Sequence, residues 1–337
     1  MIALPVDPHG RSVRYLRLSV TDRCNLRCLY CAHALGLTFI PHPNILTYEE
    51  MLRLIGLAVP LGVDKVRLTG GEPFARKGFV GFLKTLRRDF PDLDVRITTN
   101  ATLIAPHVPV LKDLGINALN ISYDTFRRET FLRISGRDMY REAEAGLHAA
   151  LASGIRVKIN AVALKGVNDD ELPAFFDLLR GHPVDVRFIE YMPLGGRGRW
   201  GENNFWSAPD ILAAANAIEE LIPLEKSNGA RKHDGPARLF RIDGAEGRFG
   251  IISPLSNHFC TDCNRIRVTS DGRLRTCLFS DVEHPIRELL RDPAQGPDAV
   301  VALMAAALRD KPLGYKLLRE RSRKDAVIRR SMSSIGG

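Results

Sequence analysis

The sequence predicts an α/β protein, and three observations lead to this fold class. Between residues 15 and 192, six short runs rich in β-branched residues alternate with segments of helical period. This alternation indicates parallel strands joined by crossover helices. Polar or glycine-rich residues follow most of the strands, as in a barrel whose strands point their carboxyl ends at one mouth. The polar segments at the strand ends favour an incomplete TIM-like (β/α)6 barrel over an open doubly wound sheet, because a doubly wound sheet offers only a single crevice.

The elements of the barrel are expected in regular order. Strands are expected at 16–20, 64–69, 94–99, 117–122, 155–163 and 185–190, and helices near 47–59, 78–89, 104–114, 138–153 and 170–180. The first helix begins with Thr47 and has Glu50 three residues later, which is the pattern of a capping box. The polar segments after the strands are TDRCNLRCLYC (21–31), GGEP (70–73), TTNA (98–101), SYDT (122–125) and EYMPLGG (190–196), and Lys158 and Asn160 lie within the fifth strand.

A second pattern begins after the glycine-rich stretch 194–204. A helix is expected near 208–220, strands at 237–242, 248–253, 264–270 and 273–279, and helices near 283–291 and 297–309. Asp271-Gly272, between the last two strands, is a hairpin turn signal. We therefore divide the chain into an N-terminal extension (1–14), a barrel (15–200), a C-terminal α+β region (201–325) and a flexible tail (326–337) that ends in Gly-Gly.

Composition narrows the class of protein. The chain has 337 residues, 45% hydrophobic and 26% charged, and no apolar run approaches the roughly 18 to 20 residues that a membrane span needs. The first residues lack the basic and apolar regions of a secretory signal, so we expect a cytoplasmic protein. Its six cysteines should then stay reduced, which favours metal or redox chemistry over disulfides. The net charge of +9 suits an anionic partner, such as a nucleotide, a nucleic acid or a membrane surface.

Three cysteines follow the first strand. Cys24, Cys28 and Cys31 have the spacing C-x3-C-x2-C. Three thiolates can hold three irons of a four-iron, four-sulfur cluster and leave the fourth iron open to a small molecule. A structural zinc site needs four ligands. His33 could supply the fourth, so zinc is kept as the weaker alternative.

The other three cysteines lie in the C-terminal region. Cys260, Cys263 and Cys277 have the spacing C-x2-C-x13-C, and His258 beside them is poorly placed as a fourth zinc ligand. A second cluster with an open iron is the consistent interpretation. Arg265 and Arg267 lie two residues apart on an expected strand and should therefore share a face. Two guanidinium groups beside a metal suit a phosphate chain, because arginine binds phosphate through two hydrogen bonds.

The first cysteine pattern, with Tyr30 before its last cysteine and GGEP downstream, resembles the signature of the radical S-adenosylmethionine superfamily. With the second cysteine trio, CNRIR (263–267) and the terminal Gly-Gly, the chain resembles the GTP 3′,8-cyclase family of molybdenum cofactor biosynthesis from about Arg11 to Gly337. The resemblance implies an incomplete (β/α)6 barrel whose lateral opening is closed by the C-terminal region. It also implies two 4Fe–4S clusters and S-adenosylmethionine. Ala101 of TTNA and Tyr123 of SYDT depart from the usual family pattern, and neither is a ligand position.

The resemblance assigns roles to individual positions. It implies cluster ligands at Cys24, Cys28, Cys31, Cys260, Cys263 and Cys277, S-adenosylmethionine contacts at Tyr30, Gly71, Ser122 and Met192, and GTP contacts at Arg17, Arg67, Thr98, Lys158, Arg265, Ile266 and Arg267. It further implies catalytic roles for Arg265, Arg267, Gly336 and Gly337, the last two reaching into the active site from the tail.

The resemblance also implies a reaction and partners. A 5′-deoxyadenosyl radical takes hydrogen from the ribose 3′ carbon of GTP, and the resulting carbon radical attacks guanine carbon 8. A downstream synthase converts the product to cyclic pyranopterin monophosphate, a reductant is required, and a homodimer is the family habit. No nucleic-acid or membrane partner is expected.

Two other functions remain open at this point. A radical S-adenosylmethionine enzyme that modifies peptides would carry more auxiliary cysteines than the three present. A basic zinc protein that binds nucleic acid would bind in a salt-sensitive way and hold no iron.

Overall fold

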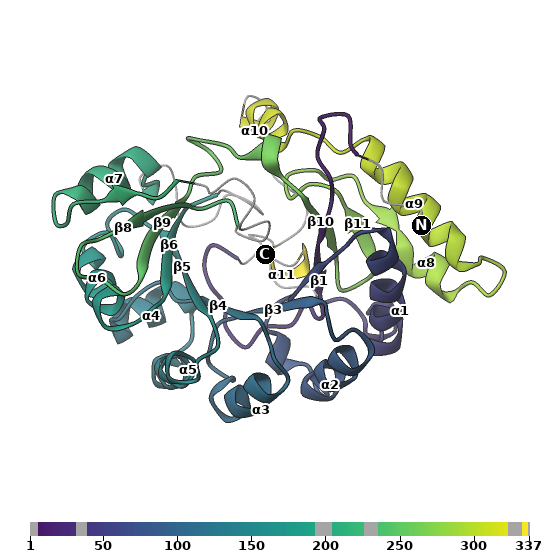
Figure 1. Cartoon of the computed structure of the whole chain (residues 1–337), viewed down its shortest axis with the longest axis horizontal. Helices are drawn as coiled ribbons and strands as arrows, with labels where there is room; N and C mark the ends of the chain where they lie inside the picture. Colours follow the sequence, from purple (N-terminus) through teal and green to yellow (C-terminus); the bar gives the residue numbers. More distant parts are fainter. Residues whose placement is uncertain (1–5, 32–38, 193–203, 226–234, 323–331, 336–337) are drawn as a thin grey trace.

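The computed structural model describes residues 6–31, 39–192, 204–225, 235–322 and 332–335. Six parallel strands form a strongly curved sheet (Figure 1), and each lies within two residues of its predicted position. They are β1 (Tyr15–Ser19), β2 (Lys65–Thr69), β3 (Asp94–Thr99), β4 (Ala118–Ser122), β5 (Val157–Ala163) and β6 (Asp185–Glu190).

Helices cover the outer side of this sheet (Figure 1). The predicted ones are α1 (Tyr48–Ala58), α2 (Phe79–Asp89), α3 (Val108–Asp113), α5 (Tyr140–Ala152) and α6 (Leu172–Gly181). The capping box at α1 is confirmed: Glu50 N donates to Thr47 Oγ1 at 3.2 Å, and Thr47 N donates to Glu50 Oε2 at 2.7 Å. Helix α4 (Arg128–Ser135) was not predicted, because it is short and its apolar Leu132 faces solvent.

Strands of the C-terminal region extend the sheet at both edges. β10 (Arg265–Val268) pairs parallel with β1, and β9 (Arg248–Ile252) pairs parallel with β6. The whole sheet has the order β12-β11-β10-β1-β2-β3-β4-β5-β6-β9-β8-β7, with β7 (Ile222–Pro223), β8 (Arg238–Arg241), β11 (Arg273–Arg275) and β12 (His284–Pro285) in antiparallel pairs. The order does not return to its first strand, so the barrel is incomplete, as predicted.

The predicted hairpin between β10 and β11 is confirmed. The two strands pair antiparallel, and Gly272 in the turn has a φ of 72°, which glycine adopts without strain. The prediction of a strand over 273–279 is too long, because β11 ends at Arg275. Cys277 therefore lies in the loop after this strand rather than within it.

The remaining helices pack near the C-terminal strands. These are α7 (Ala208–Asn216), α8 (Ile286–Arg291), α9 (Pro297–Arg309), α10 (Gly314–Ser322) and α11 (Met332–Ile335). Helices α8 and α9 lie beside α1, whereas α11 lies inside the curve of the sheet (Figure 1). Within the described ranges, no helix combines the length and the apolar character that crossing a bilayer requires.

The two faces of the barrel strands carry different residues, because successive side chains of a strand point to opposite faces. On β1, Leu16 and Leu18 are fully buried in the core between the sheet and the helices. Tyr15 and Arg17 alternate with them and line the inner side. The same alternation places Arg67 of β2 inside the barrel. The fold therefore directs cationic side chains into its interior.

Candidate active site

A cavity of about 340 Å³ occupies the inside of the barrel, and it brings the two cysteine trios together. Cys24, Cys28 and Cys31 line it from the loop after β1. Cys260, Cys263 and Cys277 line it from the loops that flank β10 and β11. The other predicted site residues that line this cavity are Arg17, Tyr30, Arg67, Gly71, Thr98, Ser122, Lys158, Met192, Arg265 and Arg267.

Two groups of predicted site residues are not placed in the cavity. The side chain of Ile266 is fully buried in the core, on the face of β10 opposite to Arg265 and Arg267. Its contact with GTP stays a prediction. Gly336, Gly337 and His33 lie outside the described residues, so their roles also stay predictions. Met332 of α11, four residues before Gly336, lines the cavity.

The GGEP loop packs directly on the backbone of the first cysteine loop. Gly71 N donates to Thr21 O at 2.7 Å, and Glu72 N donates to Arg23 O at 2.8 Å. A Cβ atom on Gly71 would lie 2.1 Å from the carbonyl oxygen of Arg23, which leaves no room for any side chain. Glycine is therefore required here for the close approach of two backbones.

Glu72 links this loop to the TTNA segment. Its buried carboxylate accepts hydrogen bonds from Thr99 Oγ1 at 2.9 Å and from Asn100 N at 2.8 Å. Burial raises the pKa of Glu72 to about 7, against the effect of the hydrogen bonds from Asn100, Phe74 and Thr99. Asn100 Nδ2 in turn lies 3.6 Å from Cys24 Sγ. The ends of β2 and β3 thus hold the first cysteine in place.

Ala101, which departs from the family pattern, has a backbone conformation that favours glycine. Its φ is 67°, and no other non-glycine residue of the described ranges has a positive φ. In this left-handed region an alanine costs about 1–2 kcal/mol, whereas a glycine has no steric penalty. The fully buried Ala101 presents its carbonyl to Gly146 of α5, where a Cβ would be only 2.0 Å from the Ala101 oxygen.

The first three cysteines form a donor set that suits the positively charged core of an iron–sulfur cluster. Burial, with the neighbouring Cys24 and Asp124 acting in the same direction, raises the pKa of Cys31 to about 12. Burial likewise raises the pKa of Cys28, with Cys31, Asp124 and Cys24 adding to the effect. Three thiolates at this site repel each other and need a positive group between them. The positively charged iron–sulfide core of a cluster provides that group.

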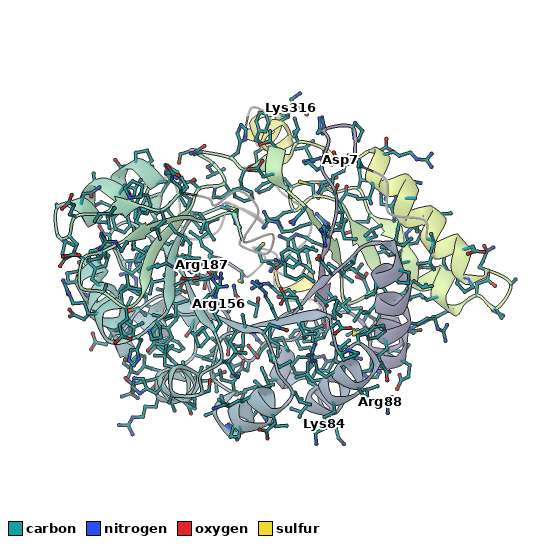
Figure 2. The ribbon with its side chains drawn as sticks, viewed as in Figure 1. Asp7, Lys84, Arg88, Arg156, Arg187 and Lys316 are labelled. Atoms are coloured by element: carbon teal, nitrogen blue, oxygen red, sulfur yellow. The ribbon has the colours of Figure 1, made fainter. Side chains whose placement is uncertain are left out.

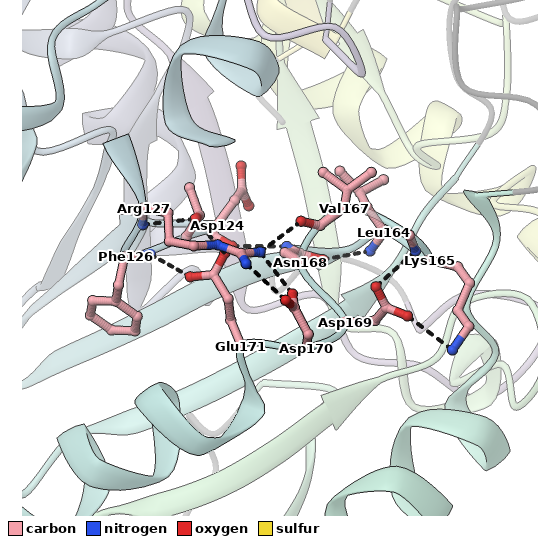
Figure 3. Close-up of polar contacts among 12 residues, drawn as sticks. Asp124, Phe126, Arg127, Leu164, Lys165, Val167, Asn168, Asp169, Asp170 and Glu171 are labelled. Carbon is pink, nitrogen blue, oxygen red and sulfur yellow. Dashed lines mark hydrogen bonds and ion pairs between the residues drawn. The ribbon is translucent and has the colours of Figure 1, made fainter. Parts of the chain in front are cut away.

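A polar network that includes Asp124, Asn168 and Glu171 fixes the loop after β4 (Figure 3). Tyr30 Oη donates to Asp124 Oδ2 at 2.6 Å, and Val162 N donates to Asp124 Oδ1 at 2.8 Å. Asn168 Nδ2 donates to the carbonyl oxygens of Asp124 and Val162 at 2.8 and 2.9 Å. Glu171 accepts from Phe126 N at 2.7 Å. The segment 164–171 therefore supports Tyr30 through Asp124, a role that the sequence did not suggest.

The second trio lies among cations instead. Burial by itself would raise the pKa of Cys263, but Arg265 and Lys311 outweigh burial and lower this pKa to about 6. Burial raises the pKa of Cys260, and Cys277 and Cys263 act in the same direction. All six cysteines of the chain are free thiols.

Eleven cationic residues of the described part of the chain line the cavity, and eight of them, which we call the cationic floor, come from six strands. The sequence analysis identified five of these eight; it missed Lys65, Arg96 and Arg187. Arg17 stands level with Arg67 on β2 and with Arg267 on β10. Several form ion pairs with acidic residues at the amino-terminal ends of the strands, such as Lys158 with Asp185 at 3.2 Å. The cationic floor consists of Arg17, Lys65, Arg67, Arg96, Lys158, Arg187, Arg265 and Arg267; Arg11, Arg27 and Lys311 line the cavity from outside the strands.

Arg187 of β6 is the clearest sign of an anionic ligand. Its side chain is buried, and its Nε and Nη2 groups have no hydrogen-bond partner among the residues that the structure describes. Burial, together with the charge of Arg67, lowers its pKa to about 9. A buried guanidinium with two unpartnered nitrogens is costly, so a ligand that accepts hydrogen bonds from them is expected. The sequence shows only an arginine within the strand DVRFIE, which a solvated strand could equally carry, so the sequence analysis missed it.

Three neutral side chains in the cavity also have unused hydrogen-bonding groups. Thr98 Oγ1, Asn120 Oδ1 and Asn160 Oδ1 are buried without a partner in the described part of the chain. A polar ligand such as a sugar or a base could satisfy them.

Tyr15 lies in the middle of the cationic floor. Its hydroxyl accepts a hydrogen bond from Arg67 Nε, and Lys65 Nζ lies 4.4 Å from its ring centroid. Burial tends to raise its pKa, but Arg67, Arg17, Lys65 and Arg265 lower it to about 7. Tyr15 thus supplies an ionisable group close to neutral pH among the cations.

Comparisons with known proteins agree with this geometry. The model of the radical SAM superfamily matches residues 18–179, and the model described as Molybdenum Cofactor Synthesis C matches residues 184–317. GTP 3′,8-cyclase from Petrotoga mobilis is 39% identical over 334 residues, covering 98% of this chain and 100% of that protein. The GTP 3′,8-cyclase from Alkaliphilus metalliredigens is 40% identical, covering 98% of this chain and 99% of that protein.

A solved structure supports the fold. Streptococcus suis SuiB bound to S-adenosylmethionine superposes with a TM-score of 0.62 at 16% identity, covering 91% of this chain and 68% of SuiB. At this identity the likeness concerns the fold alone. The curated relatives decide the family, and they set aside both the peptide-modifying and the nucleic-acid-binding alternatives. The chain belongs to the GTP 3′,8-cyclase family of radical S-adenosylmethionine enzymes.

Proposed function

We propose that this protein converts GTP to (8S)-3′,8-cyclo-7,8-dihydroguanosine 5′-triphosphate with S-adenosylmethionine, an early step of molybdenum cofactor biosynthesis. One observation carries the proposal. Two trios of free cysteines line a single cavity whose floor holds eight cationic side chains. Burying cations without a ligand lowers the stability of a fold. The stability of the core therefore does not explain this arrangement, whereas an anionic ligand does.

The first trio and its neighbours are proposed to hold the cofactors of radical generation. Cys24, Cys28 and Cys31 would bind a 4Fe–4S cluster, which when bound supplies the electron that cleaves the sulfonium bond of S-adenosylmethionine. Gly71 lines the cavity beside this trio, and it is a proposed contact of the methionyl group of that molecule. Tyr30, Ser122 and Met192 line the same part of the cavity and are its proposed further contacts.

The cationic floor is proposed to bind the triphosphate. A triphosphate carries about four negative charges, and arginine pairs with phosphate through two parallel hydrogen bonds. Arg187 has donors available for such bonds. Arg265 and Arg267 share the inner face of β10 with Arg17 level beside them. The oxygens of Thr98, Asn120 and Asn160 are the proposed partners of the ribose or guanine.

Cys260, Cys263 and Cys277 are proposed to hold a second 4Fe–4S cluster with its open iron toward the guanine. Fixing GTP between two trios on opposite sides of one cavity orients the reacting carbons and excludes water. The tail glycines Gly336 and Gly337 are proposed to complete the site from the side on which Met332 lines the cavity.

The proposal has a cellular setting. We place the protein in the cytoplasm, because a reducing compartment keeps its six cysteines free. Its product would pass to a cyclic pyranopterin monophosphate synthase, and a cellular reductant would supply electrons. The proposal also includes a homodimer. It further includes the division of the chain into four parts, with boundaries after residues 14, 200 and 325.

Anaerobic reconstitution tests this function. The wild-type chain should bind roughly eight irons, and replacing all three cysteines of either trio by alanine should leave roughly four. Release of 5′-deoxyadenosine should depend on GTP, and mass spectrometry should detect the cyclised triphosphate. Zinc in place of iron, or cleavage of S-adenosylmethionine without any cyclised product, contradicts the proposal.

Tyr15 should make GTP binding depend on pH. Its lowered pKa of about 7 means that the phenolate forms in the empty site as the pH rises past neutrality. A bound triphosphate repels a phenolate and so favours the protonated form, which means that GTP binding takes up a proton. Affinity for GTP should therefore fall between about pH 7.5 and 9, by up to tenfold per unit.

Equilibrium dialysis of GTP against the wild type and Tyr15→Phe measures this effect. The variant cannot ionise at position 15, so its affinity should vary less steeply with pH over the same range. Tyr48→Phe serves as the matched control, because burial raises the pKa of Tyr48 to about 12, outside the range tested. Equal slopes for the wild type and Tyr15→Phe would show that Tyr15 does not exchange a proton with the GTP site.

A further inference from the structure

The segment 311–315, between α9 and the first turn of α10, contacts all three cysteines of the second trio. Lys311 Nζ lies 3.8 Å from Cys263 Sγ. The backbone N–H groups of Gly314 and Tyr315 donate to the thiol of Cys260. A Cβ atom on Gly314 would lie 2.7 Å from Cys277 Sγ, so this glycine packs directly against the third sulfur.

Lys311 holds the two arms of the trio together. Its side chain is 2% exposed, and besides Cys263 its Nζ donates to Arg265 O at 2.8 Å and to Thr276 O at 2.6 Å. These carbonyls stand at the start of β10 and after the end of β11. An ammonium group has three donors, and all three are used within the protein. Lys311 therefore differs from the cations of the cavity floor, because it has no donor left for a triphosphate.

Arg11, in the N-terminal extension, locks this segment to the trio from behind. It is buried, and its guanidinium donates to Cys260 O at 2.8 Å, to Lys311 O at 2.8 Å and to Pro312 O at 3.3 Å. Asp7 accepts from Arg11 Nε at 2.5 Å and from Arg11 N at 3.0 Å, which fixes the guanidinium in place.

We call the segment 311–315 together with Arg11 the cradle of the second trio. The cradle presents positive charge to the three cysteines. A cluster bound by three thiolates is a partly buried anion, and it becomes more negative on reduction. Such a group needs a nearby cation or hydrogen-bond donors to be stable. Lys311 supplies a full charge, and the first turn of α10 supplies backbone N–H groups with the positive end of the helix dipole.

We propose that Lys311 and the N-terminus of α10 position the second cysteine trio and raise the reduction potential of the cluster bound there. In this proposal Arg11 holds the segment 311–315 against the trio through its hydrogen bonds to Cys260, Lys311 and Pro312. The inference rests on the second cluster of the proposed function. Lys311 is a positioning residue in this scheme, since it acts on the cysteines and not on GTP.

The test uses the full chain with Cys24, Cys28 and Cys31 replaced by alanine, so that only the second cluster forms. In this background, Lys311→Met keeps the length of the side chain but removes its charge and donors. Lys316→Met is the matched control: Lys316 lies in α10, five residues after Lys311, and its side chain is exposed (Figure 2). Iron content, the electron paramagnetic resonance spectrum and the midpoint potential are measured for each after reconstitution.

We expect a more negative midpoint potential and a lower iron content for Lys311→Met than for Lys316→Met. Arg11→Gln should lose iron to a chelator several-fold faster than the control, because the hydrogen bonds that join the segment 311–315 to Cys260 are lost. This second variant decides the matter if circular dichroism shows that Lys311→Met is unfolded. Potentials and iron release equal to the control in both variants would overturn the inference.

The control separates this inference from the function on which it rests. If Lys316→Met in the same background binds no iron, the second cluster itself is absent, and both the cluster and the cradle are wrong. If it binds roughly four irons but Lys311→Met behaves identically, the cluster stands and only the cradle fails.

Discussion

Replacing Gly71 by alanine should reduce S-adenosylmethionine cleavage about 100-fold or more, as displacements near 1 Å do in a preorganised site. The added Cβ would lie 2.1 Å from Arg23 O, 2.4 Å from Arg23 C and 2.8 Å from Cys24 N. All three are backbone atoms, so no side-chain rotation can relieve the contact. The loop that carries the first cysteine must move away from the GGEP loop, and the three thiols lose their common geometry.

The measurement is the iron content of the reconstituted chain together with 5′-deoxyadenosine release under reducing conditions. Gly71→Ala should lose iron from the first trio while the second trio still reconstitutes. Gly81→Ala is the matched control, because nothing lies within 4 Å of a Cβ at that position of α2. Alanine in a helix interior should leave Gly81→Ala as stable as the wild type or about 0.5–1 kcal/mol more so. Full activity in Gly71→Ala would mean that the two loops do not pack as described.

Replacing Arg187 by methionine should change GTP binding and stability in opposite directions. Hydrogen bonds to a charged group contribute about 1.5–3 kcal/mol, so the loss of the guanidinium should weaken GTP binding roughly 10- to 100-fold. In the empty protein the same guanidinium is buried, with two nitrogens that have no partner in the described residues. Its removal should therefore stabilise the ligand-free fold by about 1 kcal/mol or more.

Chemical unfolding without ligand and equilibrium dialysis with GTP measure the two effects separately. Arg156→Met is the control. Arg156 lies directly before β5 of the barrel (Figure 2), but its side chain is partly exposed and pairs with Asp185 at 3.3 Å. It should bind GTP as the wild type does and gain no stability. A general defect of folding lowers stability and binding together, so opposite changes in Arg187→Met can come only from a buried charge that the ligand satisfies. Unchanged GTP affinity would exclude Arg187 from the phosphate site.

The order of elements was largely predictable because it depends on local signals. Strand and helix periods are properties of a few neighbouring residues, and all six barrel strands were found near their expected positions. The errors were also local. Helix α4 has an exposed Leu132, which blurs its pattern, and β11 ends before Cys277 because the chain turns away after Arg275.

The candidate site was predictable where residues are close in sequence and hidden where they are not. Cysteine spacing marks a metal-ligand trio, and Arg265 and Arg267 share a face by the two-residue period of a strand. Nothing in the local sequence distinguishes Arg187 or Lys65 from an arginine or lysine on a solvated strand. Their function follows from burial, which depends on what the other strands place around them.

The sequence by itself determined the α/β class, the parallel barrel strands, the two cysteine trios and the family to which they belong, since spacing and periodicity are written along the chain. Only the tertiary structure decided that β10 pairs with β1 and β9 with β6, and that Lys311 reaches Cys263. These contacts join residues far apart along the chain. Their geometry is set by sheet pairing and packing, which no short stretch of residues encodes.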